Sequence, residues 1–229
     1  MKRSIFFQRR PMFAVALIVL LAGGACTPPP PARIETVTGS GNVITETRDV
    51  SGFSRIEMLS SGEIVVRVGD VETLTISGED NLLPLITTEA ASGWLVIRHE
   101  SHKSLSATKP LVYTITVPRL QEVKISGGGP VTATGIDEDS FTATISGASN
   151  FTLSGTAQTQ SYTINGAGFV NASALIGAQA RVTITGMGSV EVNASDSLDV
   201  TISGSGTVVY AGNPDITRNI TGQGQVIAK

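Results

Sequence analysis

The sequence predicts an all-β protein whose larger part is a parallel β-helix, a solenoid of short strands that coil into stacked turns. The first observation is a seven-residue phrase that recurs at separations of 20, 19, 20, 18 and 18 residues. Its six copies are ISGGGPV from Ile125, ISGASNF from Ile145, INGAGFV from Ile164, ITGMGSV from Ile184, ISGSGTV from Ile202 and ITGQGQV from Ile220. A unit this short cannot bury its own apolar face, so the units must stack on one another.

Two further observations support this fold. Apolar and polar residues alternate through each unit, and Phe141, Ala143 and Ile145 share one parity. Since successive side chains of a strand point to opposite faces, these three are expected to face the core. β-Branched residues and glycine dominate, and no long stretch has the 3.6-residue period of a helix. A sandwich of antiparallel strands is the alternative fold, but it gives no reason for one phrase to recur.

Residues 1–25 have the layout of a secretory signal peptide. Four basic residues precede an apolar run over residues 12–22, and small residues follow it. The apolar run is shorter than the roughly 20 residues that a membrane-spanning helix needs. We therefore expect this segment to direct export and not to belong to the fold.

Residues 26–38 are predicted to be a lipid anchor followed by a proline-rich tether. Cys26 is the only cysteine, and the sequence LLAGGAC is similar to the lipobox of bacterial lipoproteins, although Gly23 stands where leucine is usual. Unpaired thiols are uncommon in exported proteins, so we expect Cys26 to be lipidated. The following TPPPPAR suits an extended stalk. Thr27 after the cysteine indicates sorting to the outer membrane, whereas ordinary cleavage after Ala25 would give a periplasmic or secreted protein.

Residues 39–120 are predicted to form an irregular N-terminal β part, either wider turns or a capping sheet, because terminal units of solenoids are commonly atypical. Its clearest strand is PLVYTITVP, which alternates and is bracketed by Pro110 and Pro118. The phrase ISGED from Ile76 is similar to the later repeat but lacks its second glycine.

Residues 121–229 are predicted to form the regular β-helix of about six turns. In each unit a first strand meets a glycine such as Gly147 or Gly166, and a second short strand follows. We expect these corner glycines to adopt positive φ, which glycine does without steric cost. The turns should stack at about 4.8 Å, the usual distance between strands.

One outward position of the repeat holds threonine in four consecutive units. These residues are Thr144, Thr163, Thr183 and Thr201, and Lys124 holds the same position one unit earlier. If the turns stack in register, the four threonines form a ladder on the surface. Because threonine favours exposed strands, the ladder can be purely structural. The functional alternative is a flat polar surface that binds a ligand.

Four segments together resemble the putative auto-transporter adhesin, head GIN domain, family. They are GSGNVITETRDVSGFSRIE from Gly39, VRVGDVETLTISGEDNLLPLI from Val66, TKPLVYTITVP from Thr108 and the repeated Ile-Ser/Thr-Gly phrases. The resemblance runs from about Gly39 to the C-terminus. It implies a secreted or lipid-anchored protein of the bacterial cell envelope with a β-helix-like fold, right-handed by analogy. The family has no established catalytic residues, so none is carried over.

Composition and motifs exclude several classes of function. Residues 26–229 contain 12 basic and 19 acidic residues, which argues against nucleic acid and anionic membrane surfaces as partners. His99 and His102, with Glu100 between them, form a His-x-x-His pair in a polar segment, and such a pair without a further partner of defined geometry is usually part of a solvated loop. No set of nucleophile, base and oxyanion donor can be recognised. The sequence therefore predicts no catalytic site, no metal site and no cofactor.

Three functions stay open. The first is a non-enzymatic, lipid-anchored envelope protein, held at the membrane by its N-terminus, that binds a glycan or a protein through a flat Ser/Thr surface. The second is a structural envelope protein that acts by self-association or strand addition. The third is a β-helix enzyme acting on polysaccharide, which would need clustered carboxylates. Charged residues in the regular half are scattered, which disfavours the third function.

Overall fold

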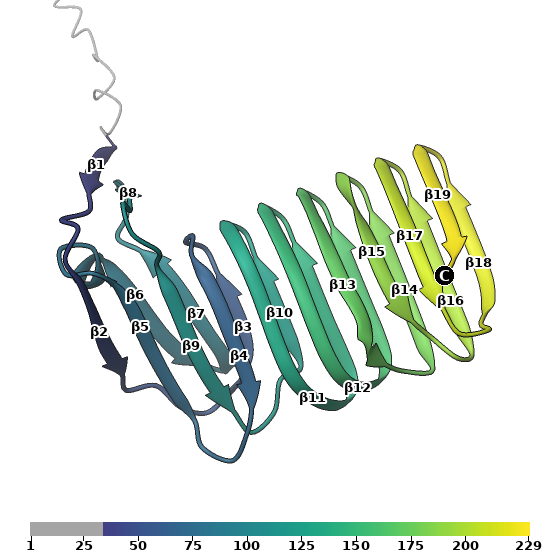
Figure 1. Cartoon of the computed structure of the whole chain (residues 1–229), viewed down its shortest axis with the longest axis horizontal. Helices are drawn as coiled ribbons and strands as arrows, with labels where there is room; N and C mark the ends of the chain where they lie inside the picture. The colour runs from purple at the N-terminus through teal and green to yellow at the C-terminus, as the bar shows by residue number, and fades with distance from the viewer. Residues whose placement is uncertain (1–33) are drawn as a thin grey trace, which may run out of the picture. The chain divides into compact units, whose positions relative to one another are not determined.

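The parallel β-helix expected from the repeats is present. In the computed structural model, which describes residues 34–229, short strands coil into a β-solenoid of about five turns (Figure 1). The six repeated phrases lie at the corners that bound these turns. Within the described residues the only helical element is one 3₁₀ turn, η1 (Leu83–Leu85). The predicted leader and Cys26 lie outside the described residues.

The strands form two walls, and most turns contribute one strand to each. Wall A contains, in spatial order, β6 (Ile86–Ala91), β7 (Gly93–His99), β3 (Phe53–Met58), β10 (Glu122–Ile125), the second halves of β11 (Gly128–Ile145) and β12 (Ala148–Ile164), β14 (Gln179–Ile184), β16 (Ser197–Ile202) and β18 (Asp215–Ile220). Wall B contains β2 (Val43–Arg48), β5 (Thr73–Glu79), β9 (Val112–Val117), β4 (Glu63–Val68), the first halves of β11 and β12, β13 (Ala167–Ile176), β15 (Met187–Asn193), β17 (Ser205–Ala211) and β19 (Gln223–Ala228). A small separate sheet pairs β1 (Glu35–Thr38) with β8 (Lys103–Ser106).

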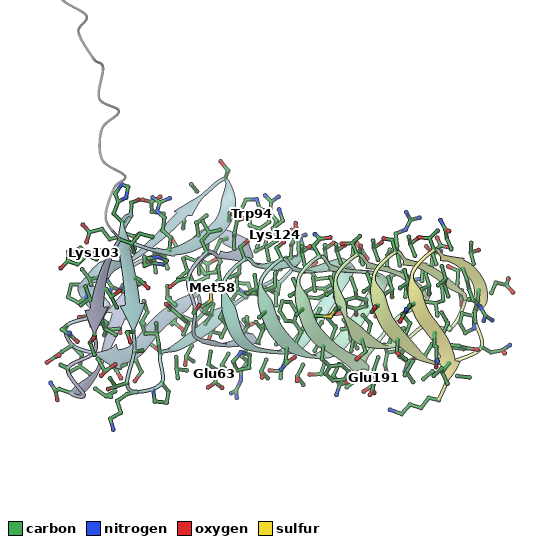
Figure 2. All side chains as sticks on the ribbon, turned by 90° about the horizontal axis from the view of Figure 1, so that it is seen from above. Met58, Glu63, Trp94, Lys103, Lys124 and Glu191 are labelled. Atoms are coloured by element: carbon green, nitrogen blue, oxygen red, sulfur yellow. The ribbon has the colours of Figure 1, made fainter. Side chains whose placement is uncertain are left out.

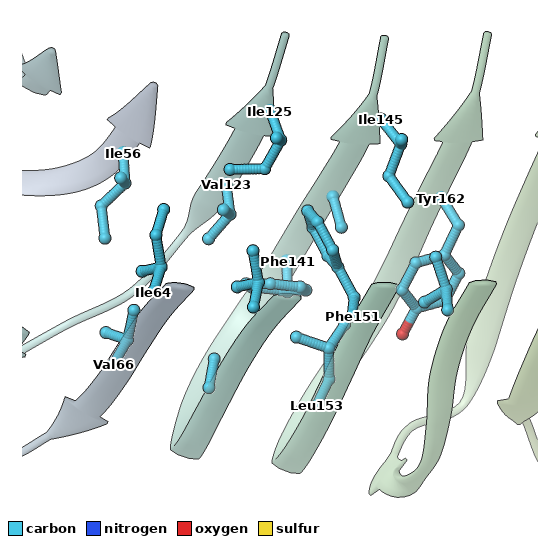
Figure 3. Packing of buried hydrophobic residues seen from close by; sticks show 14 of the residues in the cluster. Ile56, Ile64, Val66, Val123, Ile125, Phe141, Ile145, Phe151, Leu153 and Tyr162 are labelled. Atoms are coloured by element: carbon cyan, nitrogen blue, oxygen red, sulfur yellow. The ribbon is translucent and has the colours of Figure 1, made fainter. Parts of the chain in front are cut away.

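The register of the parallel strands gathers each inward position of the repeat into a buried column. In wall A the repeated isoleucines align directly, as Ile145 does with Ile164. In wall B the facing column is Val131, Phe151, Val170, Val190 and Val208. Side chains from the two walls meet between them (Figure 3). The inward parity predicted for Phe141, Ala143 and Ile145 is confirmed, since all three are buried.

The corner glycines are required for a different reason from the one the sequence suggested. None of the first glycines of the regular repeat, such as Gly166 and Gly186, has a positive φ, so that expectation was wrong. A Cβ on Gly186 would instead overlap the backbone carbonyl oxygen of Gly166 in the preceding turn. The same overlap would occur at the other corners, because stacked turns approach here through backbone atoms alone.

The second glycine of the phrase lies against both the backbone of the preceding turn and the core. A Cβ on Gly168 would overlap the carbonyl oxygen of Ser149, and one on Gly188 would overlap that of Gly168. A Cβ on Gly168 would lie 3.1 Å from Cδ1 of Ile145, and one on Gly188 would lie 3.1 Å from Cδ1 of Ile164. Four isoleucines of wall A therefore pack against the backbone of a wall B glycine in the following turn, namely Ile145, Ile164, Ile184 and Ile202. Burying an isoleucine side chain in this way contributes about 1.5–3 kcal/mol.

A fully buried amide lies among these apolar columns. Gln160 occupies the inward position that Phe141 holds in the preceding turn. Its Nε2 donates to the carbonyl oxygens of Leu175 and Asn193, each at 3.1 Å, and its Oε1 accepts from the Tyr162 hydroxyl at 2.7 Å. Burial raises the pKa of Tyr162, which keeps the hydroxyl protonated as a donor. Gln160 therefore satisfies two backbone carbonyl groups, and Tyr162 satisfies the Gln160 amide oxygen.

The N-terminal half combines parallel turns with an antiparallel end. The turn formed by β3 and β4 stacks directly on β10 and β11, and β7 and β9 add a further parallel layer beyond it. Strands β2, β5 and β6 are antiparallel to their neighbours and end the two walls. The spatial order thus differs from the chain order, because β10 pairs with β3 and not with β9.

The Glu79 carboxylate holds this cap together. It is buried and accepts hydrogen bonds from the backbone N–H groups of Gly41 (2.7 Å) and Thr108 (2.8 Å). The Thr108 hydroxyl donates at 2.6 Å and the Lys109 N–H at 3.3 Å. The Thr108 hydroxyl and these backbone donors lower the pKa of Glu79, although burial opposes them. Asp80 binds the same loop through Ser40 and Asn42.

We predict that Gly186→Ala destabilises the solenoid, because its Cβ would meet backbone that cannot move without disturbing two turns. Overpacking of this kind costs about 1–3 kcal/mol. For a chain of this length each kcal/mol lowers the melting temperature by about 2–4 °C. Thermal unfolding followed by circular dichroism measures the change.

The control is Met187→Ala at the next position, where the side chain is 66% exposed. We expect its melting temperature to match that of the wild type. An equal melting temperature for Gly186→Ala and wild type would show that the corners are not tightly packed.

The Glu79 site predicts a dependence of stability on pH. Since the folded-state pKa lies below the ordinary value of 4.5, the carboxylate stabilises the fold above that pH, and its contribution is lost as the pH falls through the folded-state pKa. We expect Glu79→Gln to lower the melting temperature at pH 7 and to flatten its fall between about pH 5 and pH 3.

Glu35→Gln, at an exposed position of β1, is the matched control and should reproduce the wild-type profile. If Glu79→Gln and wild type show the same acid profile, the Glu79 carboxylate does not stabilise the cap.

Candidate functional site

The strand register places the four threonines of the repeat side by side on the outer face of wall A. Thr144 pairs with Thr163, Thr163 with Thr183, and Thr183 with Thr201. Lys124 stands next to Thr144 at one end of the row. At the usual spacing between strands, neighbouring positions of this threonine ladder are about 4.8 Å apart.

The ladder hydroxyls are available to a ligand. Thr144, Thr163 and Thr183 are half-buried and Thr201 is exposed. None of the four hydroxyls hydrogen-bonds to another residue in the described part of the chain. The four threonines therefore do not hydrogen-bond to one another. Each hydroxyl can donate one hydrogen bond and accept two.

A second outer row runs beside the ladder and makes this surface polar but nearly neutral. Thr142, Ser161, Arg181 and Asp199 follow one another in it. Arg181 and Asp199 form an exposed ion pair at 3.2 Å. The surface therefore offers hydrogen bonds without a strong field of one sign, and it suits an uncharged polar ligand better than a polyanion.

A tryptophan with two cations over its ring, which the sequence did not reveal, lies at the N-terminal end of the same face. Trp94, the only tryptophan of the chain, is half-buried on β7. The Arg55 guanidinium carbon lies 4.9 Å from its ring centroid and the Lys124 Nζ lies 4.7 Å from it. Both distances are within the range of cation–π attraction. The outward direction of the Trp94 side chain could have been inferred from the alternation in WLVIRHE. Leu95 and Ile97 are buried, so Trp94, which has the opposite parity, faces outward.

The two walls present their outer faces in opposite directions. Figure 2 shows Trp94 and Lys124 along one side of the solenoid and Glu63 and Glu191 along the other. A ligand on the threonine ladder would therefore leave the outer face of wall B free.

The two histidines that the sequence offered as metal ligands are not joined by further ligands in the described part of the chain. Among residues 34–229 no three His, Cys, Asp or Glu side chains are placed to hold a metal ion. His102 is exposed in a turn with φ of 66°, and His99 is half-buried. Within the same residues no helix is long and apolar enough to cross a membrane.

The lipidation site predicted at Cys26 lies outside the described residues. The end of the predicted tether does fall within them, where Glu35–Thr38 forms β1 and pairs with β8.

Comparison with protein families gives a match over most of the chain. A sequence profile described as putative auto-transporter adhesin, head GIN domain, matches residues 52–214. Comparison with curated proteins gave no match.

Solved structures share the fold. A putative adhesin from Bacteroides fragilis has a TM-score of 0.68 and 24% sequence identity, covering 84% of this chain and 100% of that chain. A putative lipid binding protein from Parabacteroides distasonis has a TM-score of 0.51 and 20% identity, covering 85% of this chain and 100% of that chain. At these identities the likeness concerns the fold alone.

Proposed function

This chain belongs to the putative auto-transporter adhesin, head GIN domain, family, and on that premise we propose that it is a non-enzymatic binding protein of the bacterial cell envelope. Its ligand site is the threonine ladder on the outer face of wall A. The main support for this proposal is the strand register, which aligns Thr144, Thr163, Thr183 and Thr201 in one row. Their hydroxyl groups make no hydrogen bond to another described residue. The ligand is a glycan or a protein surface that offers repeated hydrogen-bonding groups.

The rigidity of the wall supports this proposal. The ladder residues lie in central strands with a hydrogen-bonded neighbour on both sides, so binding orders no backbone. A ligand therefore meets preorganised groups, which lowers the entropic cost of association. A flat row of hydroxyls gives weak individual contacts, and affinity would come from several contacts made together.

The proposed location is the outer membrane, to which the chain is held by a lipid on Cys26. The signal-like residues 1–25, the solitary cysteine and the proline-rich segment after it support this arrangement. Thr27 supports outer-membrane sorting. An anchored solenoid would present both walls to partners without crossing the membrane.

We predict that the double variant Thr163→Ala/Thr183→Ala binds whole cells or glycan arrays more weakly than the wild type, because two adjacent hydroxyls are lost from the ladder. Its melting temperature should stay within a few degrees of wild type, since surface substitutions usually change stability by about 0.5 kcal/mol or less.

The matched control is Thr152→Ala/Thr132→Ala, a pair aligned in the same way on the outer face of wall B. Unchanged binding by the wall A variant, or an equal loss in the wall B control, would reject the ladder as the site.

We predict that Cys26 carries a diacylglyceryl group and an N-acyl chain in the membrane fraction. Intact-mass spectrometry of the wild type should show the added mass, and Cys26→Ser should appear unmodified in the soluble fraction. An unmodified wild-type chain would instead establish a periplasmic or secreted protein and remove the anchor from the proposal.

A further inference from the structure

The outer face of wall B carries a groove that is separate from the threonine ladder. It has a volume of about 690 Å³ and crosses β13, β15, β17 and β19. Its floor includes the backbone of Gly188, Gly206 and Gly224, which stand in one column by strand pairing. Their sequence neighbours form the sides, so the groove follows from the same repeat that builds the core.

The lining of the groove combines one aromatic ring and the Val209 side chain with uncharged polar groups. Phe169 lies at the β13 end, and Ser189, Thr207 and Gln225 continue its row across the next three strands. Gln223 borders the glycine floor on its other side. Hydroxyl and amide groups supply both donors and acceptors, which few other side chains do without a charge.

The groove also lacks a free charge. Glu191 is the only ionisable side chain among its lining residues, and Lys229 Nζ lies 3.3 Å from its carboxylate. A phosphate or sulfate ligand would need arginine or lysine donors, and the one lysine nearby is already paired. The lining therefore disfavours nucleic acids and anionic lipids and favours a neutral ligand rich in hydroxyl groups.

The dimensions favour a chain over a single small molecule. The row from Phe169 to Gln225 spans three strand spacings, or roughly 14 Å at about 4.8 Å each. The groove is fixed by parallel strands and needs no rearrangement to accept an extended ligand.

We propose that this groove binds a linear neutral glycan, with the Phe169 ring packed against the apolar face of one sugar and the amides of Gln223 and Gln225 bonded to sugar hydroxyls. The site does not rest on the threonine ladder, which lies on the opposite wall. It would give the protein a second ligand surface of defined chemistry.

The test is isothermal titration calorimetry of the full-length protein with cellohexaose and maltohexaose, and with hexagalacturonate as the charged comparator. We expect saturable binding of at least one neutral hexasaccharide and weaker binding of the acidic one. Phe169→Ala should weaken binding by about tenfold or more, as loss of a central aromatic contact usually does. Gln225→Ala should weaken it to a smaller extent.

Matched controls separate this site from general effects on the surface. Ile176→Ala removes a side chain that is 59% exposed at the far end of the same strand, β13, outside the groove. Gln179→Ala removes an exposed amide on wall A. Both should bind the hexasaccharide as the wild type does.

A fluorescence experiment locates the bound ligand, and it keeps the proposal testable even if Phe169→Ala does not fold. Since Trp94 is the only tryptophan and lies on wall A, its emission should not change when the groove fills. The variant Trp94→Phe/Phe169→Trp moves the reporter into the groove. This variant should bind the hexasaccharide with the affinity of the wild type, and its tryptophan emission should change as the groove is saturated.

Three outcomes would overturn the proposal. The first is that neither neutral hexasaccharide binds saturably, and the second is that the protein binds hexagalacturonate more tightly than the neutral sugars. The third is that Thr163→Ala/Thr183→Ala loses hexasaccharide binding while Phe169→Ala keeps it in full. The last outcome would assign the glycan to the threonine ladder, so failure of the groove and failure of the ladder give different results.

Discussion

The fold depends on direct backbone contact between successive corners of the solenoid. The residue after each corner glycine donates to the glycine carbonyl of the preceding turn, as Ala167 does to Gly147 at 2.9 Å and Met187 to Gly166 at 3.0 Å. A Cβ on Gly166 would overlap the carbonyl oxygen of Gly147, and a Cβ on Gly186 would overlap that of Gly166. A glycine on the later turn allows this approach, as at Gly127, which lies over the Ser60 carbonyl oxygen. A slip of one residue would put a side chain into the contact and turn the apolar columns outward.

This fixed register decides what the surface can do. When turns stack residue on residue, one position of the repeat becomes one column of the wall, and similar residues at that position give a uniform strip. Wall A thereby acquires a threonine ladder, with Lys124 and Trp94 near one end. Wall B acquires an outer row that begins with Phe169 and continues with hydroxyl and amide side chains. This row borders the groove whose floor is the glycine backbone. Such surfaces are suited to binding extended ligands, because they repeat one kind of contact and do not gather dissimilar catalytic groups at one point.

The N-terminal cap joins, in space, segments that are far apart in the sequence and that carry the resemblance to the family. The GSGN segment from Gly39 and the GEDN segment from Gly78 are far apart in the chain, but the Glu79 carboxylate accepts from the Gly41 N–H, and Asn81 accepts from the Ser40 N–H. The Thr108 segment supplies two more donors to the same carboxylate. Three of the recognisable phrases are thus parts of one hydrogen-bonded cluster that closes the end of the walls.

The sequence by itself determined the fold class, which alternate residues of each strand face the core, and the outward repeat position that the four threonines share. Each of these follows from a short local period. It did not determine why the corners need glycine, since that constraint comes from the preceding turn and not from the φ of the residue itself. Nor did it show that β10 pairs with β3, that Gln160 bonds to Tyr162 inside the core, or that Arg55 and Lys124 approach Trp94. The tertiary structure decided these features, because they arise from pairing between strands that are not adjacent in the chain and from hydrogen bonds that burial makes obligatory.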